Sequence, residues 1–334
     1  MKTHPGRSTY IAQLLLSIAL LLFLGLASAC QRPGGQDLQS ISLPMGYVAN
    51  VQFSPFYVAK ELGYFAQEGF DVTFDYRWET DGIQLTASGE VPFTVASGDQ
   101  IIQARSHGLP VIAIAGWYQR FPVAIISLEG TPLDSPQHLR GLRIGIPETF
   151  GASYIGLRAL LEVGGLTEED IELQTIGYTQ LAALTNGTVD AVVVYANNEP
   201  VVLAHQGVPF NMLKVADYVD LVSAVIASSD AFTADEPESV KGFVRAFLRG
   251  LSDTLADPDA AFETSKKYVE GLEENAEVQR AVLTASIALW QTPTPGMMQA
   301  EPWARAQDVM LQAGLIERPT PVDELFTNAF IEVP

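Results

Sequence analysis

The sequence predicts an α/β fold with two lobes, mostly parallel sheets and a helical C-terminal tail. Short apolar runs alternate with helical patterns, which is typical of βαβ units around parallel strands. One series of alternating strand and helix patterns precedes Arg140, and a second, similar series begins there. We call each series a cycle. From Glu236 onward the pattern is almost wholly helical. We therefore expect two α/β lobes joined by extended crossovers at 121–128 and 221–228, with the tail packed on the first lobe.

Proline and glycine mark the ends of helices in the first cycle. Pro55 opens a helix, because proline suits the first helical turn, and Gly89 ends a later one. Strands are predicted at 41–47, 70–76, 92–96 and 111–115, and helices from Pro55, at 81–89 and at 98–107.

The second cycle repeats this order. Asn186 and Gly187 end a short helix ahead of a buried strand that is rich in valine. Strands are predicted at 142–146, 171–175 and 189–195, helices at 153–163 and 180–185, and extended runs at 210–214 and 221–227. The tail helices are predicted at 240–255, 258–271, 277–289 and 302–313.

The N-terminus has the pattern of an export signal. Lys2 and Arg7 precede an apolar run, and small residues follow it directly before Cys30, the only cysteine. A cysteine at this cut resembles a bacterial lipobox, whose thiol is diacylated, although Ala27 stands where leucine is commoner. The alternatives are an ordinary cleaved signal and a transmembrane helix, for which the run is long enough but rich in small residues.

These features predict how the chain is organised. A lipoprotein signal peptide would occupy 1–29, and a polar, turn-rich linker 30–40. The first lobe would comprise 41–125 plus 228–334, and the second lobe 126–227. We expect an extracytoplasmic protein that Cys30 holds at the cell membrane.

Charge and motifs exclude several functions. Without Lys2 and Arg7 the chain has 17 basic and 39 acidic residues, a formal charge of −22, which repels nucleic acid. The scattered histidines show no metal-ligand spacing, and there is no Walker lysine motif. The run from Gly151 to Gly156 is one residue longer than a nucleophile elbow. We expect a monomeric protein that is not an enzyme and has no metal or cofactor.

Three stretches, at 55–69, 139–147 and 184–194, resemble a known family in their order and spacing. The chain is similar to the ABC-importer substrate-binding proteins for sulfonates, nitrate, thiamine-precursor pyrimidines and riboflavin. The resemblance implies the two-lobe periplasmic-binding-protein fold (type II), in which a two-strand hinge closes the lobes on a small molecule destined for an ABC permease. Within this family, further stretches resemble the riboflavin-binding branch, and they lie at 47–57, 79–82, 95–100, 117–119, 150–156 and 195–200.

Candidate ligand-binding residues lie in the loops after the predicted strands, because ligands of open α/β sheets bind beyond the carboxyl ends of the strands. These loops are rich in aromatic and amide side chains and contain acids but few cations, which suits a neutral or weakly cationic heteroaromatic ligand. The predicted contacts are Asn50, Gln52, Phe53, Trp78, Ser97, Asp99, Trp117, Tyr118, Gly151, Ser153, Tyr154, Tyr195, Asn197, Asn198 and Glu199. The same loops contain Glu79, Glu148, Phe150 and Tyr178.

Several of these residues have a structural alternative. Asp99, Gly151 and Ser153 also suit helix caps, and Tyr195 also suits the core. Residues 197–199 also suit a turn ahead of a proline. The ligand we expect is riboflavin, with a thiamine-precursor pyrimidine, a sulfonate or nitrate as alternatives. A secreted enzyme is the distant alternative, although fungal pyrimidine synthases of this fold use a cysteine-rich motif that the chain lacks.

Overall fold

The computed structural model describes residues 38–332. The predicted signal peptide, the lipid attachment at Cys30 and the first part of the predicted linker lie outside the described residues. Within residues 38–332, no helix is both long and apolar enough to cross a membrane.

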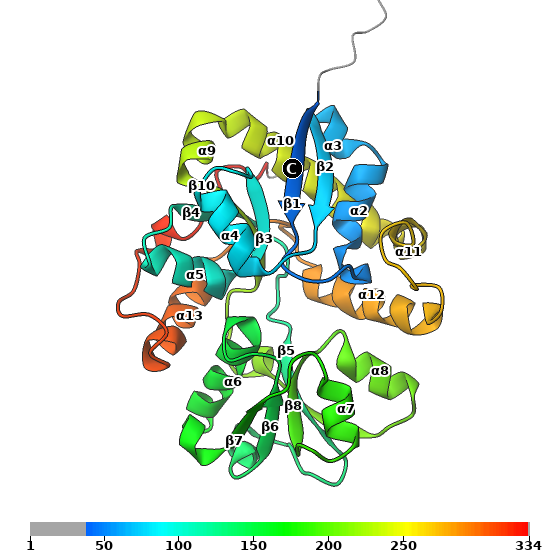
Figure 1. Cartoon of the computed structure of the whole chain (residues 1–334), viewed down its shortest axis with the longest axis vertical. Helices are drawn as coiled ribbons and strands as arrows, with labels where there is room; N and C mark the ends of the chain where they lie inside the picture. Colours follow the sequence, from blue (N-terminus) through cyan, green and yellow to red (C-terminus); the bar gives the residue numbers. More distant parts are fainter. Residues whose placement is uncertain (1–37, 333–334) are drawn as a thin grey trace, which may run out of the picture. The chain divides into compact units, whose positions relative to one another are not determined.

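Two small sheets organise the first lobe (Figure 1). Strand β1 (Gln39–Pro44) pairs in parallel with β2 (Phe70–Asp75). Strand β10 (Ala224–Ser229) lies between β3 and β4 and runs antiparallel to both. The other elements are β3 (Phe93–Ser97), β4 (Val111–Gly116), the 3₁₀ helix η2 (Val51–Phe53), α2 (Ser54–Glu61), α3 (Tyr64–Gln67), α4 (Glu79–Ala87), α5 (Gly98–Ser106) and α9 (Asp230–Asp235).

A five-stranded sheet in the order β7-β6-β8-β5-β9 organises the second lobe. Its central strand, β8 (Ala191–Tyr195), is almost wholly buried, as its run of valines predicts. The other elements are β5 (Val123–Leu128), β6 (Arg143–Ile146), β7 (Glu172–Thr175), β9 (Phe210–Lys214), α6 (Gly151–Val163), α7 (Gln180–Thr185) and α8 (Glu199–His205). We call residues 39–116 and 224–332 lobe 1, and residues 123–214 lobe 2.

The sheets are mixed, which corrects the expectation of mostly parallel sheets. Among the described strands, parallel pairing joins β1 to β2 and β6 to its neighbours β7 and β8, and one isolated parallel bridge joins Ala113 to Phe326. The strands that follow each crossover, β5 and β10, run antiparallel to their partners because the chain enters each lobe there from the other one. The predicted boundaries after residues 125 and 227 fall inside these two strands, so the connections between the lobes are the short segments 117–122 and 215–223.

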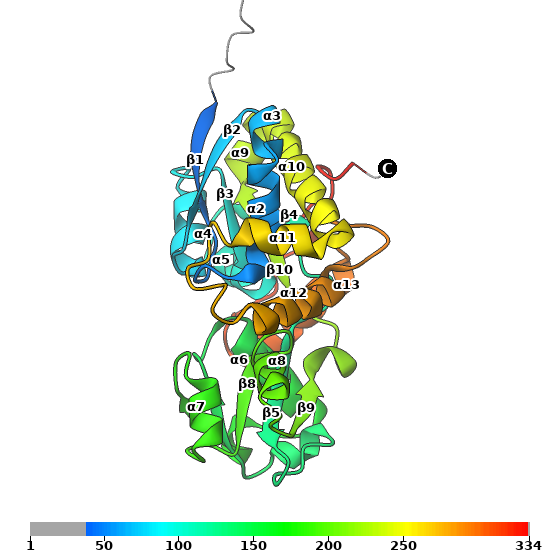
Figure 2. The same ribbon diagram turned by 90° about the vertical axis from the view of Figure 1, so that its right-hand side faces the viewer.

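The tail consists of four helices. Both α10 (Pro237–Ala256) and α11 (Pro258–Ser265) pack on α2 of lobe 1, and α12 (Ala276–Trp290) contacts η2 and α8 (Figure 2). Helix α13 (Ala300–Gln312) contacts α5 of lobe 1 and also α6 of lobe 2. The tail therefore packs on the first lobe, as expected, and also contacts the second through α12 and α13.

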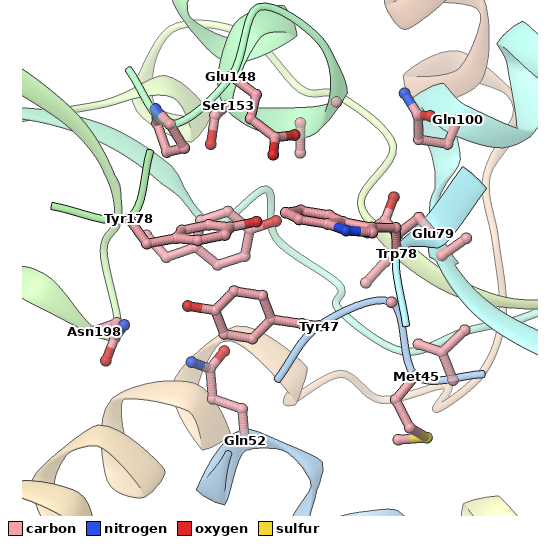
Figure 3. Close-up of a pocket in the computed structure, with 18 of the residues that line it drawn as sticks. Met45, Tyr47, Gln52, Trp78, Glu79, Gln100, Glu148, Ser153, Tyr178 and Asn198 are labelled. Carbon is pink, nitrogen blue, oxygen red and sulfur yellow. The ribbon is translucent and has the colours of Figure 1, made fainter. Parts of the chain in front are cut away.

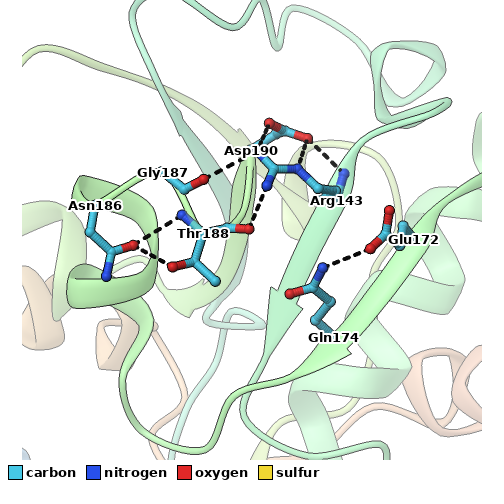
Figure 4. Close-up of polar contacts among 7 residues, drawn as sticks. All are labelled: Arg143, Glu172, Gln174, Asn186, Gly187, Thr188 and Asp190. Atoms are coloured by element: carbon cyan, nitrogen blue, oxygen red, sulfur yellow. Dashed lines mark hydrogen bonds and ion pairs between the residues drawn. The ribbon is translucent and has the colours of Figure 1, made fainter.

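Two of the stretches that carry the family resemblance meet at a polar cluster in lobe 2 (Figure 4). The Arg143 guanidinium pairs with the Asp190 carboxylate at 2.7 Å and donates to the Thr188 carbonyl at 2.7 Å. The Asn186 side-chain oxygen accepts from the Thr188 amide at 3.0 Å. These contacts fix the turn between α7 and β8 against the first residue of β6, so these residues act in folding, at the strand ends away from the loops predicted to bind ligand.

Gly250 allows α10 and α2 to approach closely. A Cβ atom at this position would lie 2.2 Å from the Pro55 carbonyl oxygen and 2.7 Å from the Ala59 Cβ. We expect Gly250→Ala to lower the free energy of unfolding by about 1–3 kcal/mol, because overpacking outweighs the better helix propensity of alanine. Urea unfolding measures this change. Gly130→Ala, which places a Cβ in open space, is the control, and equal stabilities of the two variants would contradict the expectation.

Candidate ligand-binding cleft

A cavity lies between the two lobes at the carboxyl ends of their strands. Lobe 1 contributes the residues after β1 and β2 and the ends of β3 and β4. Lobe 2 contributes the loops after β6 and β7 and the end of β8. This is where an open α/β sheet presents its loops, so the position agrees with the one expected from the predicted strands.

Ten of the predicted contact residues line this cavity, and five do not. Those that line it are Gln52, Phe53, Trp78, Trp117, Tyr118, Gly151, Ser153, Tyr195, Asn198 and Glu199. Those that lie off its wall are Asn50, Ser97, Asp99, Tyr154 and Asn197.

The residues off the wall hold other groups in place. Asn50 caps η2, since its side-chain oxygen accepts from the Gln52 amide at 3.0 Å. The Tyr154 hydroxyl donates to the Glu168 carboxylate at 2.7 Å, within lobe 2. Asn197 is 1% exposed and lies behind the wall. The sequence did not show the direction of these side chains, and Tyr154, which was expected in a loop, lies in α6.

Aromatic rings from both lobes meet at the mouth of the cavity. Trp78 of lobe 1 and Tyr178 of lobe 2 are nearly parallel, with 17° between their planes and 6.0 Å between their centroids. Tyr47 meets Tyr178 edge to face at 5.4 Å. Figure 3 shows the Trp78 and Tyr178 rings reaching toward one another, with Tyr47 beneath them. Trp78 and Tyr178 are 50% and 51% exposed, so flat apolar faces remain available to a ligand.

Deeper in lobe 1 the wall is a packed aromatic cluster. The rings of Phe53 and Trp117 lie 5.5 Å apart, and Trp117 packs against Phe56 and Trp290. Phe56 is fully buried and does not line the cavity. This cluster fixes the inner surface of the cavity, whereas the rings at the mouth are free on one side.

Glu79 is the most constrained carboxyl group of the cavity. Its Oε2 atom accepts from the Ser97 hydroxyl at 2.6 Å and from the Ser97 amide at 3.1 Å. Its side chain lies against Gly46, which has φ +75° and where a Cβ would come within 2.7 Å of the Glu79 Cγ. Burial, followed by the charge of Asp99, raises the pKa of Glu79 to about 7, and Glu148 of lobe 2 adds to the increase. Glu79 therefore carries a proton in a large share of molecules at neutral pH.

The other carboxyl groups near the cavity share this tendency. Burial raises the pKa of Asp99 to about 6, and it also raises the pKa of Glu148 and Glu199 above the ordinary value. Among the described residues, no lysine, arginine, histidine or cysteine lines the cavity. The walls therefore offer ring faces and polar edges to a neutral ring system, whereas for a small anion they offer backbone amides, such as those at the N-terminus of α6, but no cationic side chain among the described lining residues.

The sequence-based list missed several lining residues. Tyr47 was assigned to the end of a strand, but β1 ends at Pro44 and Tyr47 lies in the following loop. Glu79, Glu148 and Tyr178 were recognised as loop residues but were not chosen as contacts. The signal that identifies them is position alone, since each follows a strand of its sheet.

Comparisons with known proteins agree with this geometry. A family model described as NMT1/THI5 like matches residues 50–261. The chain is 42% identical over 314 residues to the riboflavin-binding protein RibY of Chloroflexus aurantiacus, covering 91% of this chain and 90% of that protein. It is 29% identical over 322 residues to the formylaminopyrimidine-binding protein of Halalkalibacterium halodurans, covering 93% of this chain and 97% of that protein.

A solved structure shows the same fold. The periplasmic aliphatic sulphonate binding protein SsuA from Escherichia coli superposes with a TM-score of 0.69 over 88% of this chain and 92% of that one. At 13% sequence identity this likeness shows the fold alone, which is that of a two-lobe periplasmic binding protein.

Proposed function

The chain belongs to the NMT1/THI5-like family, and from this premise we propose that it is an extracytoplasmic substrate-binding protein that captures riboflavin and delivers it to an ABC permease. The observation that carries the ligand assignment is the pair of half-exposed rings, Trp78 and Tyr178, that face one cavity from opposite lobes. A flat ring system that contacts both of them links the two lobes.

The chemistry of riboflavin suits such a cavity. Its isoalloxazine is a flat, uncharged ring system that stacks on aromatic side chains. Its polar ring edge, which has two carbonyls and one N–H group, and its ribityl hydroxyls pair with side-chain amides. The N–H group and the hydroxyls can donate to a carboxylate, and the carbonyls can accept from a protonated carboxyl group. The lining residues Gln52, Gln100, Ser153 and Asn198 supply amide and hydroxyl partners from both lobes.

Hinge bending completes the proposed mechanism. The segments 117–122 and 215–223 are the two connections between the sheets of the lobes, and we assign the bending to them. A ligand that contacts both lobes favours the closed state by its additional contacts in that state. Ligand release at the permease then requires the reverse bending.

A thiamine-precursor pyrimidine is the second candidate ligand, since the formylaminopyrimidine-binding relative covers almost the whole chain. Titration of the purified protein, made without its first 30 residues, distinguishes the two. Riboflavin bound between aromatic rings loses its fluorescence, so stoichiometric quenching at micromolar concentration is expected. A thermal-shift panel of riboflavin, formylaminopyrimidine and an alkanesulfonate ranks the ligands, because binding to the native state raises the melting temperature. If formylaminopyrimidine alone shifted it, the riboflavin assignment would be wrong.

The proposed protein binds its ligand without changing it. The two curated relatives reported above are both described as binding proteins, which supports binding without chemical change. Mass spectrometry of riboflavin recovered after prolonged incubation should return the unaltered molecule. A modified product would instead support an enzyme.

We also propose that Cys30 carries the lipid anchor. Expression of the full chain in a bacterium with lipoprotein processing should place it in the membrane fraction, with a lipid-modified N-terminus in its mass spectrum. Cys30→Ala should abolish the modification. A wild-type protein found in the extracellular or periplasmic fraction without lipid would favour the ordinary signal peptide.

A further inference from the structure

A chain of buried hydrogen bonds runs from α12 to the cavity. The Ser286 hydroxyl donates to the Val282 carbonyl at 2.7 Å, one helical turn earlier. The Asn197 side-chain nitrogen donates to the Ser286 oxygen at 2.7 Å and to the Tyr118 oxygen at 3.3 Å.

The cavity end of this chain is Gln52. The Tyr118 hydroxyl donates to the Gln52 Oε1 atom at 2.7 Å. Gln52 and Tyr118 line the cavity and are 8% and 6% exposed, whereas Asn197 and Ser286 behind them are 1% and 0% exposed. Figure 3 shows the Gln52 amide directed into the cavity below Tyr47.

The Val282 carbonyl, as the first acceptor, determines which group donates in each of these hydrogen bonds. A backbone carbonyl only accepts, so the single Ser286 hydrogen is used on Val282 and the Ser286 oxygen accepts from Asn197. The group of Asn197 that faces Ser286 is therefore its NH₂, whose second hydrogen is directed at the Tyr118 oxygen. The phenol hydrogen of Tyr118 is then directed at Gln52. Burial raises the pKa of Tyr118 above its ordinary value, so this hydrogen is retained.

The reverse direction is energetically worse. If the Asn197 amide were turned over, Ser286 and Tyr118 would donate to its oxygen, and the bond from Ser286 to Val282 would be lost. The NH₂ of Asn197 would then lie where its Oδ1 atom lies now, which is buried and has no partner. A buried amide donor without a partner is rarer in proteins than a carbonyl without one, because the carbonyl is the less costly of the two.

We propose that Gln52 is a specificity residue whose NH₂ group is held toward the ligand by the series of hydrogen bonds that begins at Val282. The ligand then presents a hydrogen-bond acceptor, such as a ring carbonyl, to this NH₂ group. This inference rests on the proposed function for the identity of the ligand, but not for the direction of the bonds. Tyr118 and Asn197 are positioning residues that act through Gln52. Asn197 follows β8 in lobe 2, whereas Ser286 lies in lobe 1. The series of hydrogen bonds is therefore complete only while these parts of the two lobes are in contact.

Gln52→Glu tests the donor. Its carboxylate still accepts from Tyr118 but turns a second acceptor toward the ligand, so riboflavin binding at pH 8 should weaken by about 10- to 100-fold. Glu79 and Asp99 also titrate between pH 8 and 5, so each affinity is compared with that of the wild type at the same pH. On this comparison, lowering the pH to 5 should recover part of the loss, since the introduced carboxyl group, once protonated, again donates. Gln84→Glu makes the same change at an exposed position outside the cavity, and it should bind riboflavin as the wild type does at pH 8 and at pH 5. Equal affinities of the wild type and Gln52→Glu at pH 8 would overturn the proposal.

Tyr118→Phe tests the positioning. This variant lacks the hydroxyl that donates to Gln52, so the Gln52 amide is free to rotate. Riboflavin binding should therefore weaken by about 3- to 10-fold. In a Gln52→Met background the same change should cost nothing further, because no amide remains to be held. A purely structural role would give the same loss in both backgrounds. Tyr218→Phe removes an exposed hydroxyl outside the cavity and is the control.

Neutron diffraction from crystals of the ligand-free protein locates the deuterons, and so it shows which atom donates in each hydrogen bond when no ligand is bound. Deuterium is expected between the Tyr118 and Gln52 oxygens, and two deuterons on the Gln52 atom that faces the cavity. Two deuterons on the Gln52 atom that faces Tyr118 would overturn the proposal. If the wild type bound no riboflavin, the proposed function would fail, while this measurement would still decide the inference.

Discussion

Replacing Trp78 by alanine is expected to weaken riboflavin binding by about 10- to 100-fold, since stacking of a flat base on an aromatic side chain is worth about 1–3 kcal/mol. Trp78 is 50% exposed beside the N-terminus of α4 and meets Tyr178 across the cavity mouth. The free energy of unfolding should change little, because half of the ring already lies in solvent. Fluorescence titration gives the affinity and urea unfolding gives the stability.

Two further variants sharpen this test. Trp78→Phe keeps a flat face and should retain most of the affinity. Tyr218→Ala removes a ring that is 41% exposed outside the cavity, and it should bind riboflavin as the wild type does. An unaltered affinity in Trp78→Ala would mean that the ligand does not reach the mouth of the cavity.

Glu79→Gln is expected to make the protein more stable at pH 8 by up to about 3 kcal/mol while leaving its stability at pH 4.5 nearly unchanged. The folded protein holds the pKa of Glu79 at about 7, above the value of 4.5 for a free side chain. The folded state therefore binds more protons between these values, and wild-type stability falls as the pH rises from about 4.5 through 7. Glutamine resembles the protonated acid and removes this fall. The figure is an upper limit, since Glu79 borders a cavity that admits water.

Urea unfolding at several pH values between 4.5 and 8 measures the effect. Glu129→Gln, at an exposed position, is the matched control and should leave the pH profile of stability unchanged. Parallel profiles for the wild type and Glu79→Gln would show that the folded protein does not hold a proton at this site.

Local patterns predicted most of the fold. Predicted strands such as 111–115 and 210–214, and the helix at 180–185, match β4, β9 and α7 closely, because each is a short apolar or amphipathic run between turn residues. Helix α8 was missed, since Pro200 suggested a turn and in fact occupies the first turn of the helix. The pairing of β10 between β3 and β4 depends on contacts across more than a hundred residues, which no local pattern encodes.

The sequence predicted where the cavity lies, but not which way its side chains point. Strand ends identified Trp78, Trp117 and Tyr195 as cavity residues. The direction of each side chain depends on its partners, as with Tyr154, which its bond to Glu168 turns away from the cavity. The raised pKa of Glu79 was equally inaccessible from the sequence, because it arises from burial and from charges on other elements.

Helix α13 limits the ways in which the protein can open. Its Arg305 pairs with Glu162 of α6 at 3.0 Å, and its Met310 shares one core cluster with Ile101 of α5 and Leu157 of α6. The two lobes are thus joined by the backbone at two crossovers and by the side-chain packing of α13, in addition to the contacts that α12 makes with α8 and Asn197 of lobe 2. Mutations along α13 are therefore a route to altering the open-to-closed ratio, and so the apparent affinity for any ligand, without touching the cavity.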